Sequence, residues 1–241
     1  MVCVEHVEVA RADSPRGELV LRERRPDAGD PPGSSAALEL RANGVFVMDT
    51  VEVGTERALA TAALALVEHP SSVLVGGLGL GYTLHEVLGD PRVERCTVVE
   101  LEPALVDWMR DGTVPHGPAL LADARAHLVV ADLADAVREA RAAAYDLVLL
   151  DVDNGPEHLV HAANAALYAV PFLREVARVL RPGGAVVVWS ADEAPALGDT
   201  LREVFDDVGA QALAVDLQGR AEHYWLHVAR VSPTATDAAG G

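Results

Sequence analysis

The sequence predicts an α/β fold with a mixed seven-stranded sheet, preceded by a small antiparallel β-hairpin subdomain. Three observations support this. A buried strand, a glycine turn, a helix and a second strand follow one another between residues 73 and 102. Strand-like and helix-like segments then keep alternating to about residue 190, which is typical of a parallel sheet covered on both faces. Finally, two strand-like segments joined by a short turn close the sequence, which indicates an antiparallel pair.

The N-terminal part differs in texture from the rest. Residues 19–24 and 37–41 read as strands, separated by a loop at 26–35 that is rich in Pro, Gly, Asp and Ser. Asn43-Gly44 then leads into a third strand at 45–49, and Asn-Gly between alternating strands is a strong hairpin signal. We therefore expect a small antiparallel sheet ahead of the main domain.

An alanine-rich helix from Thr55 to about His69 opens the main domain. The segment Arg181-Pro-Gly-Gly184 supplies the turn into the last parallel strand. The parallel strands, with helices between them, are expected at residues 73–76, 96–100, 127–131, 146–150 and 185–190.

The C-terminal part predicts a helix at 196–207 and the antiparallel pair at 210–217 and 223–231. The last ten residues are small and polar, and we expect them to be disordered. The predicted domains are therefore an N-terminal β-hairpin subdomain (1–54), a ligand-binding domain (55–231) and a tail (232–241).

The glycine turn is the most informative part of the chain. At Gly77, Gly79 and Gly81 a side chain would fill space that a ligand needs. The third glycine comes one residue earlier than in the dinucleotide pattern G-x-G-x-x-G, which favours S-adenosylmethionine over NAD. Glu100 follows roughly 20 residues later, where a carboxylate can accept both ribose hydroxyl hydrogens. The alternative is a tight strand-to-helix turn without a ligand.

Composition excludes several classes of function. Thirty-seven acidic against nineteen basic residues give a net charge of −18, which repels nucleic acids and anionic membrane surfaces and attracts a cationic amine. Cys3 and Cys96 are too few for a disulfide framework or a zinc site. No apolar run has the length of a membrane span and no secretory signal opens the chain, so we expect a cytoplasmic protein.

Five segments at the ends of expected strands carry a family resemblance. They are Gly76-Gly-Leu-Gly-Leu-Gly81, Val99-Glu-Leu-Glu-Pro103, Val129-Val-Ala-Asp132, Tyr145-Asp-Leu-Val-Leu-Leu-Asp-Val-Asp-Asn-Gly-Pro156 and Leu180-Arg-Pro-Gly-Gly184. From the N-terminal hairpin to about residue 231, the chain resembles the spermidine synthase-like branch of the class I S-adenosylmethionine-dependent methyltransferases. This superfamily has a Rossmann-like sheet.

The resemblance implies a cofactor site for S-adenosylmethionine. Glu100 would bind the ribose and Asp132 would accept the adenine amino group. We count the neighbouring Leu101 and Leu133 among the cofactor-binding residues, together with the three turn glycines and Asp151. The alternative for Asp132 is an N-cap of the helix that follows it.

Catalytic residues are expected just after the fourth parallel strand, at Asp151 and Asp153. The resemblance implies that Asp151 corresponds to the first acid of an Asp-x-x-Asp motif, which helps to deprotonate or position an attacking amine. Asn154 takes the place of the second acid. The alternative for Asp151 is a cap of the following turn.

Substrate-binding residues are expected at Glu56, Asn154, His158, His161 and Tyr168. The two histidines could form a metal site with the nearby acids, but their spacing is not diagnostic and we predict no metal. Glu56 lies where the family binds polyamines, although its helix could also favour an acid in the first turn. The family's Gln and Tyr-His are replaced by Met48 and Thr55-Glu56, which puts diamine recognition in doubt.

One departure bears on the reaction. Spermidine synthases have an acid in the glycine loop, a counter-ion for the free amine of decarboxylated S-adenosylmethionine, and this chain has Gly79 there. Loop amides without an acid suit the carboxylate of S-adenosylmethionine, which favours methyl transfer to a small amine- or hydroxyl-bearing metabolite. The alternatives are a polyamine aminopropyltransferase and a non-catalytic cofactor-binding or scaffold protein. The resemblance also implies a homodimer.

Overall fold

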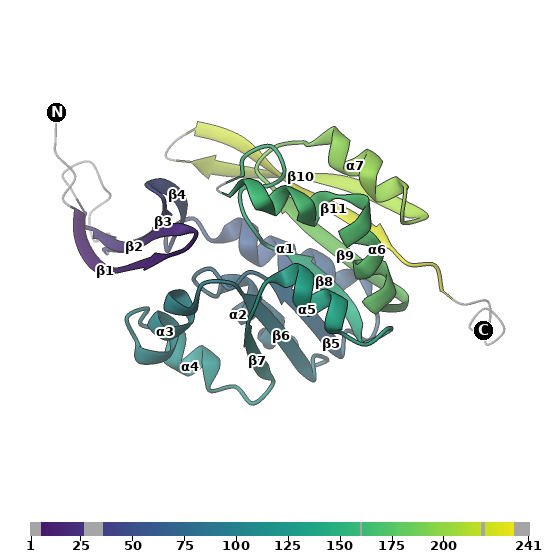
Figure 1. Ribbon diagram of the computed structural model, residues 1–241, viewed down its shortest axis with the longest axis horizontal. Helices are drawn as coiled ribbons and strands as arrows, with labels where there is room; N and C mark the ends of the chain where they lie inside the picture. Colours follow the sequence, from purple (N-terminus) through teal and green to yellow (C-terminus); the bar gives the residue numbers. More distant parts are fainter. Residues whose placement is uncertain (1–5, 27–35, 160, 218–219, 234–241) are drawn as a thin grey trace.

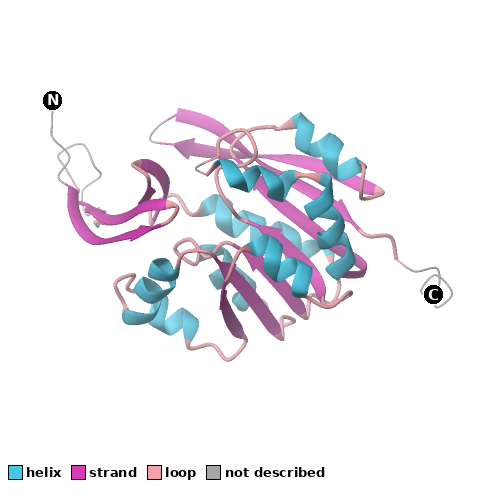
Figure 2. Cartoon of the chain, in the orientation of Figure 1, coloured by secondary structure: helices cyan, strands magenta, loops and turns pink. Residues whose placement is uncertain are grey.

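The computed structural model describes residues 6–26, 36–159, 161–217 and 220–233 of the chain. A seven-stranded sheet with helices on both faces forms the body of the molecule, and a separate four-stranded sheet lies beside it (Figure 1). Figure 2 shows that the helices lie in two groups, one on each side of the large sheet. No helix in the described part of the chain is long and apolar enough to cross a bilayer.

The N-terminal sheet is antiparallel throughout, in the order β1-β2-β3-β4. Its strands are β1 (His6–Ser14), β2 (Gly17–Arg24), β3 (Ala37–Ala42) and β4 (Val45–Asp49). The Asn43-Gly44 hairpin is confirmed, with both residues at positive φ (52° and 77°) as a tight hairpin turn requires. Strand β1 was not expected, because it is a largely solvent-facing edge strand interrupted by a bulge.

The large sheet has the order β10-β11-β9-β8-β5-β6-β7, which confirms the predicted mixed seven-stranded sheet. Five strands are parallel, whereas β11 runs antiparallel to both β9 and β10. The strands are β5 (Ser72–Gly76), β6 (Arg95–Glu100), β7 (Ala126–Val130), β8 (Tyr145–Leu150), β9 (Leu180–Ser190), β10 (Asp207–Leu217) and β11 (Arg220–Arg230).

The helices cover the sheet in two layers because successive strand residues point to opposite faces. Val73 and Val75 contact one core, which also contains buried residues of α1, α2 and α3, whereas Leu74 contacts the other core, with residues of α5, α6 and α7. The helices are α1 (Gly54–Leu66), α2 (Tyr82–Gly89), α3 (Pro103–Asp111), α4 (Gly117–Leu121), α5 (Leu133–Glu139), η1 (Ala162–Tyr168), α6 (Val170–Val179) and α7 (Pro195–Arg202).

Element boundaries differ from the sequence-based expectation in a few places. Helices α1 and α7 end earlier than expected, at Leu66 and Arg202. Strand β9 begins already at Leu180, which pairs with Tyr145 before the register shifts, so the Arg-Pro-Gly-Gly turn is an irregularity within the strand. Most of the expected disordered tail (232–241) and most of the 26–35 loop lie outside the described residues.

The parallel strands β5, β6, β7 and β8 all end at the same edge of the sheet, and the N-terminal sheet lies next to this edge in Figure 1. The loops that follow these strands therefore face the N-terminal sheet, which is where ligands bind in open α/β sheets.

Candidate functional site

A cavity of about 290 Å³ opens between the ends of the parallel strands and the N-terminal sheet. Its walls come from the β1–β2 turn, the β3–β4 hairpin, the glycine turn, the loops after β6, β7 and β8, and η1. The structure brings most of the predicted site residues together here: Glu56, Gly77, Gly79, Glu100, Leu101, Asp132, Leu133, Asp151, Asp153, Asn154 and His161.

The glycine turn requires glycine for a reason additional to the expected one, which was space for a ligand. Gly77, Gly79 and Gly81 all have positive φ, at 91°, 50° and 86°. A Cβ at Gly77 would lie 2.2 Å from the carbonyl oxygen of Asp151, and one at Gly79 would lie 2.7 Å from the sulfur of Met48. The backbone of the Asp151 loop therefore excludes a side chain at Gly77 before any ligand binds, whereas a side chain at Gly79 would have to displace the flexible end of Met48.

The amides of this turn are only partly engaged. The Leu78 N–H donates to Oε2 of Glu100 at 2.9 Å, and the Leu80 N–H lies 3.2 Å from the Met48 sulfur, a weak acceptor. The Gly79 N–H has no partner among the described residues. Two adjacent amides are thus open to a stronger acceptor.

Glu100 is fixed by the backbone at the end of β6. Its two oxygens accept hydrogen bonds from the amides of Leu78 and Glu102, the latter at 2.8 Å. Its burial, with 8 % exposure, raises the pKa of this carboxyl above its ordinary value. Each oxygen keeps a lone pair for a further donor, such as a hydroxyl group.

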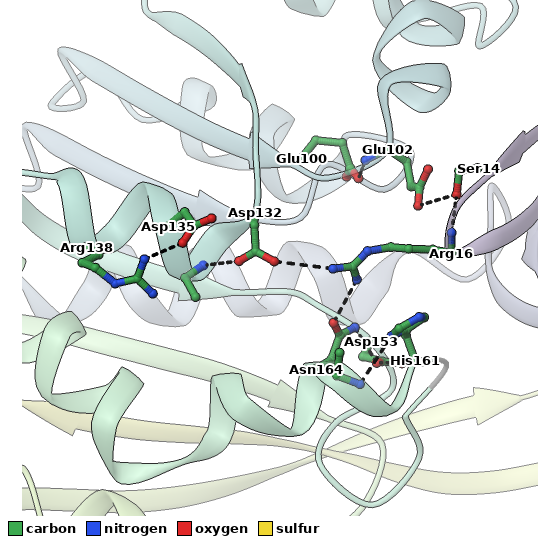
Figure 3. Close-up of polar contacts among 12 residues, drawn as sticks. Ser14, Arg16, Glu100, Glu102, Asp132, Asp135, Arg138, Asp153, His161 and Asn164 are labelled. Carbon is green, nitrogen blue, oxygen red and sulfur yellow. Dashed lines mark hydrogen bonds and ion pairs between the residues drawn. The ribbon is translucent and has the colours of Figure 1, made fainter.

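Asp132 lies after β7 and is the N-cap of α5, since its Oδ1 accepts the Ala134 N–H at 2.8 Å. Its Oδ2 faces the guanidinium of Arg16 at 3.4 Å (Figure 3). The capping role is therefore present, and Oδ2 remains on the cavity wall for the adenine contact that the sequence predicts.

Asp151 and Glu56 are two half-buried carboxyl groups on the cavity wall, near enough for the charge of Asp151 to act on Glu56. Asp151 accepts the hydroxyl hydrogen of Thr83, at the start of α2, at 2.5 Å. Burial raises the pKa of Asp151 to about 6. Burial, and then the nearby Asp151, raise the pKa of Glu56 to about 7.

Asp153 lies in a strained loop conformation, with φ of 64°. Its Oδ2 accepts hydrogen bonds from the Asn164 side chain at 2.8 Å and from the His161 amide at 3.5 Å. The Asn154 amide donates to its other oxygen. Asp153 thus ties the loop after β8 to η1.

Three predicted site residues do not line the cavity. Gly81 begins α2 and faces Leu120 and Met109. His158 is on the surface, where its Nε2 lies 2.6 Å from Asp192, and Tyr168 is buried and donates its hydroxyl hydrogen to the Val152 carbonyl at 2.6 Å. Tyr168 therefore supports the loop that carries Asp151 and Asp153, but its side chain does not line the cavity.

Several cavity residues were missed by the sequence analysis because they come from the N-terminal sheet or lie far along the chain. They are Ser14, Arg16, Asn43, Glu102 and Asn164. The only feature of the sequence that pointed to one of them is Gly17, next to Arg16. In the structure Gly17 has a φ of 116° and forms the tight β1–β2 turn.

The cavity wall is strongly acidic. Among the described lining residues one is Arg and none is Lys, whereas seven are acidic: Glu18, Glu56, Glu100, Glu102, Asp132, Asp151 and Asp153. Such a surface attracts cations. Within the described residues, however, no group of three or more His, Cys, Asp or Glu is arranged to hold a metal ion.

Comparison with known families agrees with this geometry. The model of the spermine/spermidine synthase domain matches residues 52–212, which include the glycine turn and the parallel strands β5, β6, β7 and β8 that end at the cavity, but not the N-terminal sheet. The chain belongs to this family. S-adenosylmethionine or its decarboxylated form is the co-substrate typical of spermidine synthase family transferases.

Individual relatives of this spermidine synthase family member carry out different reactions. Putrescine N-methyltransferase 3 of Nicotiana tabacum is 36% identical over 125 residues, 51% of this chain and 31% of the relative. Polyamine aminopropyltransferase 2 of Pseudomonas aeruginosa is 36% identical over 152 residues, 58% of this chain and 41% of the relative. The matched segments therefore span well under half the length of these curated relatives.

The fold extends the similarity over nearly the whole chain. The crystal structure of spermidine synthase from Thermotoga maritima superposes with a TM-score of 0.74 at 18% identity, covering 95% of this chain and 74% of that one. This confirms a spermidine synthase-like fold that includes the N-terminal antiparallel sheet.

Proposed function

We propose that this spermidine synthase family member is an S-adenosylmethionine-dependent methyltransferase that acts on a small amine-bearing metabolite. The observation that carries the proposal is the contact of the Leu80 amide with the Met48 sulfur, next to the open Gly79 amide. The resemblance implies an acid at this position in spermidine synthases, whereas this chain has Gly79, at positive φ, with the Met48 sulfur 2.7 Å from where its Cβ would lie.

This contact favours a donor with a carboxylate. The Gly79 amide is open and the Leu80 amide meets only a thioether, which a carboxylate would displace because charged acceptors form stronger hydrogen bonds. An aspartate at this position would repel that carboxylate and would instead bind the free amine of the decarboxylated donor. Its absence supports methyl transfer over aminopropyl transfer.

The remaining donor contacts follow from the strand ends. In this proposal Glu100 holds the ribose hydroxyls, with Leu101 beside it, while Asp132 accepts the adenine amino group next to Leu133. The pocket is preformed for such a ligand, since backbone amides already orient both carboxylates.

The acidic pair supports an amine as the acceptor rather than a hydroxyl. Glu56 and Asp151 are both half-buried on the cavity wall, and the charge of Asp151 raises the pKa of Glu56, so the two carboxylates are mutually unfavourable unless a cation or a proton offsets their charges. An ammonium group satisfies this pair. Its proton passes to one of the carboxylates, whose raised pKa values of about 6 and 7 suit a general base near neutral pH.

The bound donor supplies a methyl group on a positively charged sulfur. In the proposed step the amine nitrogen forms a bond to the methyl carbon as the carbon–sulfur bond breaks, leaving S-adenosylhomocysteine and an N-methylated product. The chain's contribution is to hold the neutral amine in line, which is sufficient for large rate enhancement without further acid or base groups.

The test is a comparison of donors. Binding of S-adenosylmethionine and of decarboxylated S-adenosylmethionine is measured by isothermal titration, and products with di- and polyamines are identified by mass spectrometry. We expect N-methylated amines and a preference for S-adenosylmethionine. A preference of about tenfold or more for the decarboxylated donor, with aminopropylated products, would establish aminopropyl transfer instead.

A second test distinguishes an enzyme from a protein that only binds the cofactor. We expect Asp151→Asn to abolish turnover of the amine while S-adenosylhomocysteine still binds. Donor binding without any detectable turnover in the unmodified protein would indicate a cofactor-binding or scaffold protein and would contradict the proposed activity.

A further inference from the structure

The β1–β2 turn places one basic side chain in the acidic cavity. Arg16 is the single Arg or Lys among the described lining residues, and its side chain is 27% exposed. It extends from the N-terminal sheet across the cavity mouth to Asp132 and Asn164 (Figure 3). The proposed methyl transfer does not use this residue.

Two side chains hold the backbone of this turn at Arg16, and a third side chain anchors one of them. The Arg16 amide donates to the Ser14 hydroxyl at 3.1 Å, and the Arg16 carbonyl accepts from the Asn43 side chain at 3.1 Å. The Ser14 hydroxyl in turn donates to Glu102, after β6, at 3.2 Å. Both polar backbone groups of Arg16 are thus satisfied by side chains, so its position over the cavity is preorganised.

The side chain completes the environment of the predicted adenine acceptor. One terminal nitrogen of Arg16 donates to Oδ2 of Asp132 at 3.4 Å, and the other donates to Oδ1 of Asn164 at 3.4 Å. Because Ala134 holds Oδ1 of Asp132, the carboxylate is held from both sides and can turn only if one contact breaks. Asn164 is itself fixed by Asp153.

We propose that Arg16 is a positioning residue for the nucleobase of the donor: it orients Asp132 to accept the adenine amino group and thereby makes the site selective for adenine. This inference rests on the proposed function, because it assumes an adenosyl donor. A carboxylate with a fixed Oδ2 accepts an N–H group but repels a carbonyl oxygen at the same place. Selectivity against a base with oxygen in place of the amino group therefore depends on how firmly Asp132 is held.

The experiment measures the dissociation constants of S-adenosylhomocysteine and S-inosylhomocysteine, which differ at that amino group. The unmodified protein is expected to prefer the adenosyl compound. In Arg16→Gln the preference should fall by roughly tenfold, mainly through weaker binding of the adenosyl compound. Arg16→Lys keeps the charge but not the two-pronged geometry and should restore the preference only in part.

The matched control is Arg138→Gln. Arg138 pairs with Asp135 on the outer side of α5, close to Asp132 but outside the cavity (Figure 3). This variant should leave both dissociation constants unchanged. Thermal melting of each variant identifies any loss of folding.

The outcomes separate the two proposals. If the unmodified protein binds neither compound, the proposed function fails. If it prefers the adenosyl compound and Arg16→Gln retains the same preference, only the role of Arg16 is overturned. Tighter adenosyl binding by Arg16→Gln would also overturn it, because Arg16 would then be competing with the donor.

Discussion

At the scale of single residues, the site is governed by carboxyl groups that burial keeps out of water. Asp151 and Glu56 have raised pKa values because their charged forms are poorly solvated, and Thr83 offsets this only in part at Asp151. Burial of these two groups lowers the free energy of unfolding by an amount that depends on pH.

Glu56→Gln tests this cost. The folded protein keeps the Glu56 proton up to a pH of about 7, whereas the unfolded chain loses it near its ordinary pKa of 4.5. The free energy of unfolding should therefore fall as the pH rises from about 4.5 to about 7 and then stay level. We expect Glu56→Gln to be more stable than the unmodified protein by up to about 3 kcal/mol at pH 8 and equal to it near pH 4.

Urea unfolding at both pH values measures the difference. The control is Glu68→Gln, because the Glu68 side chain is 89% exposed and should show the same stability at both pH values as the unmodified protein. A pH-independent gain in Glu56→Gln would contradict the explanation by burial.

At the scale of elements, the glycine turn between β5 and α2 fits closely against the end of β8. Gly77 combines a positive φ with a Cβ position 2.2 Å from a backbone oxygen, which cannot move away as a side chain can. Gly79 faces only the flexible end of Met48.

In Gly77→Ala the added methyl group should push the glycine turn away from the loop that carries Asp151. We expect a loss of about 2–3 kcal/mol in stability and loss of donor binding, measured by chemical unfolding and isothermal titration. Gly89→Ala is the matched control, because Gly89 ends α2 and a Cβ there meets no atom within 4 Å. Equal behaviour of the two variants would show that the close approach is unimportant.

The sequence alone predicts the elements whose pattern is local. Alternating apolar segments predict the parallel sheet, and acids at strand ends, such as Glu100 and Asp132, are placed at the cavity by topology alone. Strand β1 could not be predicted in this way, because it is an edge strand whose polar residues face solvent. His158 and Tyr168 were expected in the cavity, but loop shape decides where such residues point, and sequence does not fix loop shape.

At the scale of the whole molecule, two sheets that share one hydrophobic core enclose an acidic cavity. Arg16 could not be predicted from the sequence because its partner Asp132 is 116 positions away and the two meet only when the N-terminal sheet packs over the strand ends. The expected homodimer stays a prediction.

The acidity of the cavity and of the chain should make acceptor binding sensitive to salt. With a net charge of −18, the protein attracts a cationic amine through a field that salt screens. We expect the KM for a diamine to rise by about three- to tenfold between 0.05 and 0.5 M NaCl, with little change in kcat. Binding of the uncharged nucleoside 5′-methylthioadenosine serves as the control, and a KM independent of salt would contradict this electrostatic attraction.

The Asn43-Gly44 hairpin is a site at which the protein can deamidate slowly. An asparagine followed by glycine is prone to lose its side-chain amide nitrogen, which would turn two N–H donors into a carboxylate that only accepts. The Arg16 carbonyl, now paired with that amide, would then face a negative charge. Slow deamidation would in this way release the turn that carries Arg16, and aged preparations would lose the preference for adenine that we propose for Arg16 while the core stays intact.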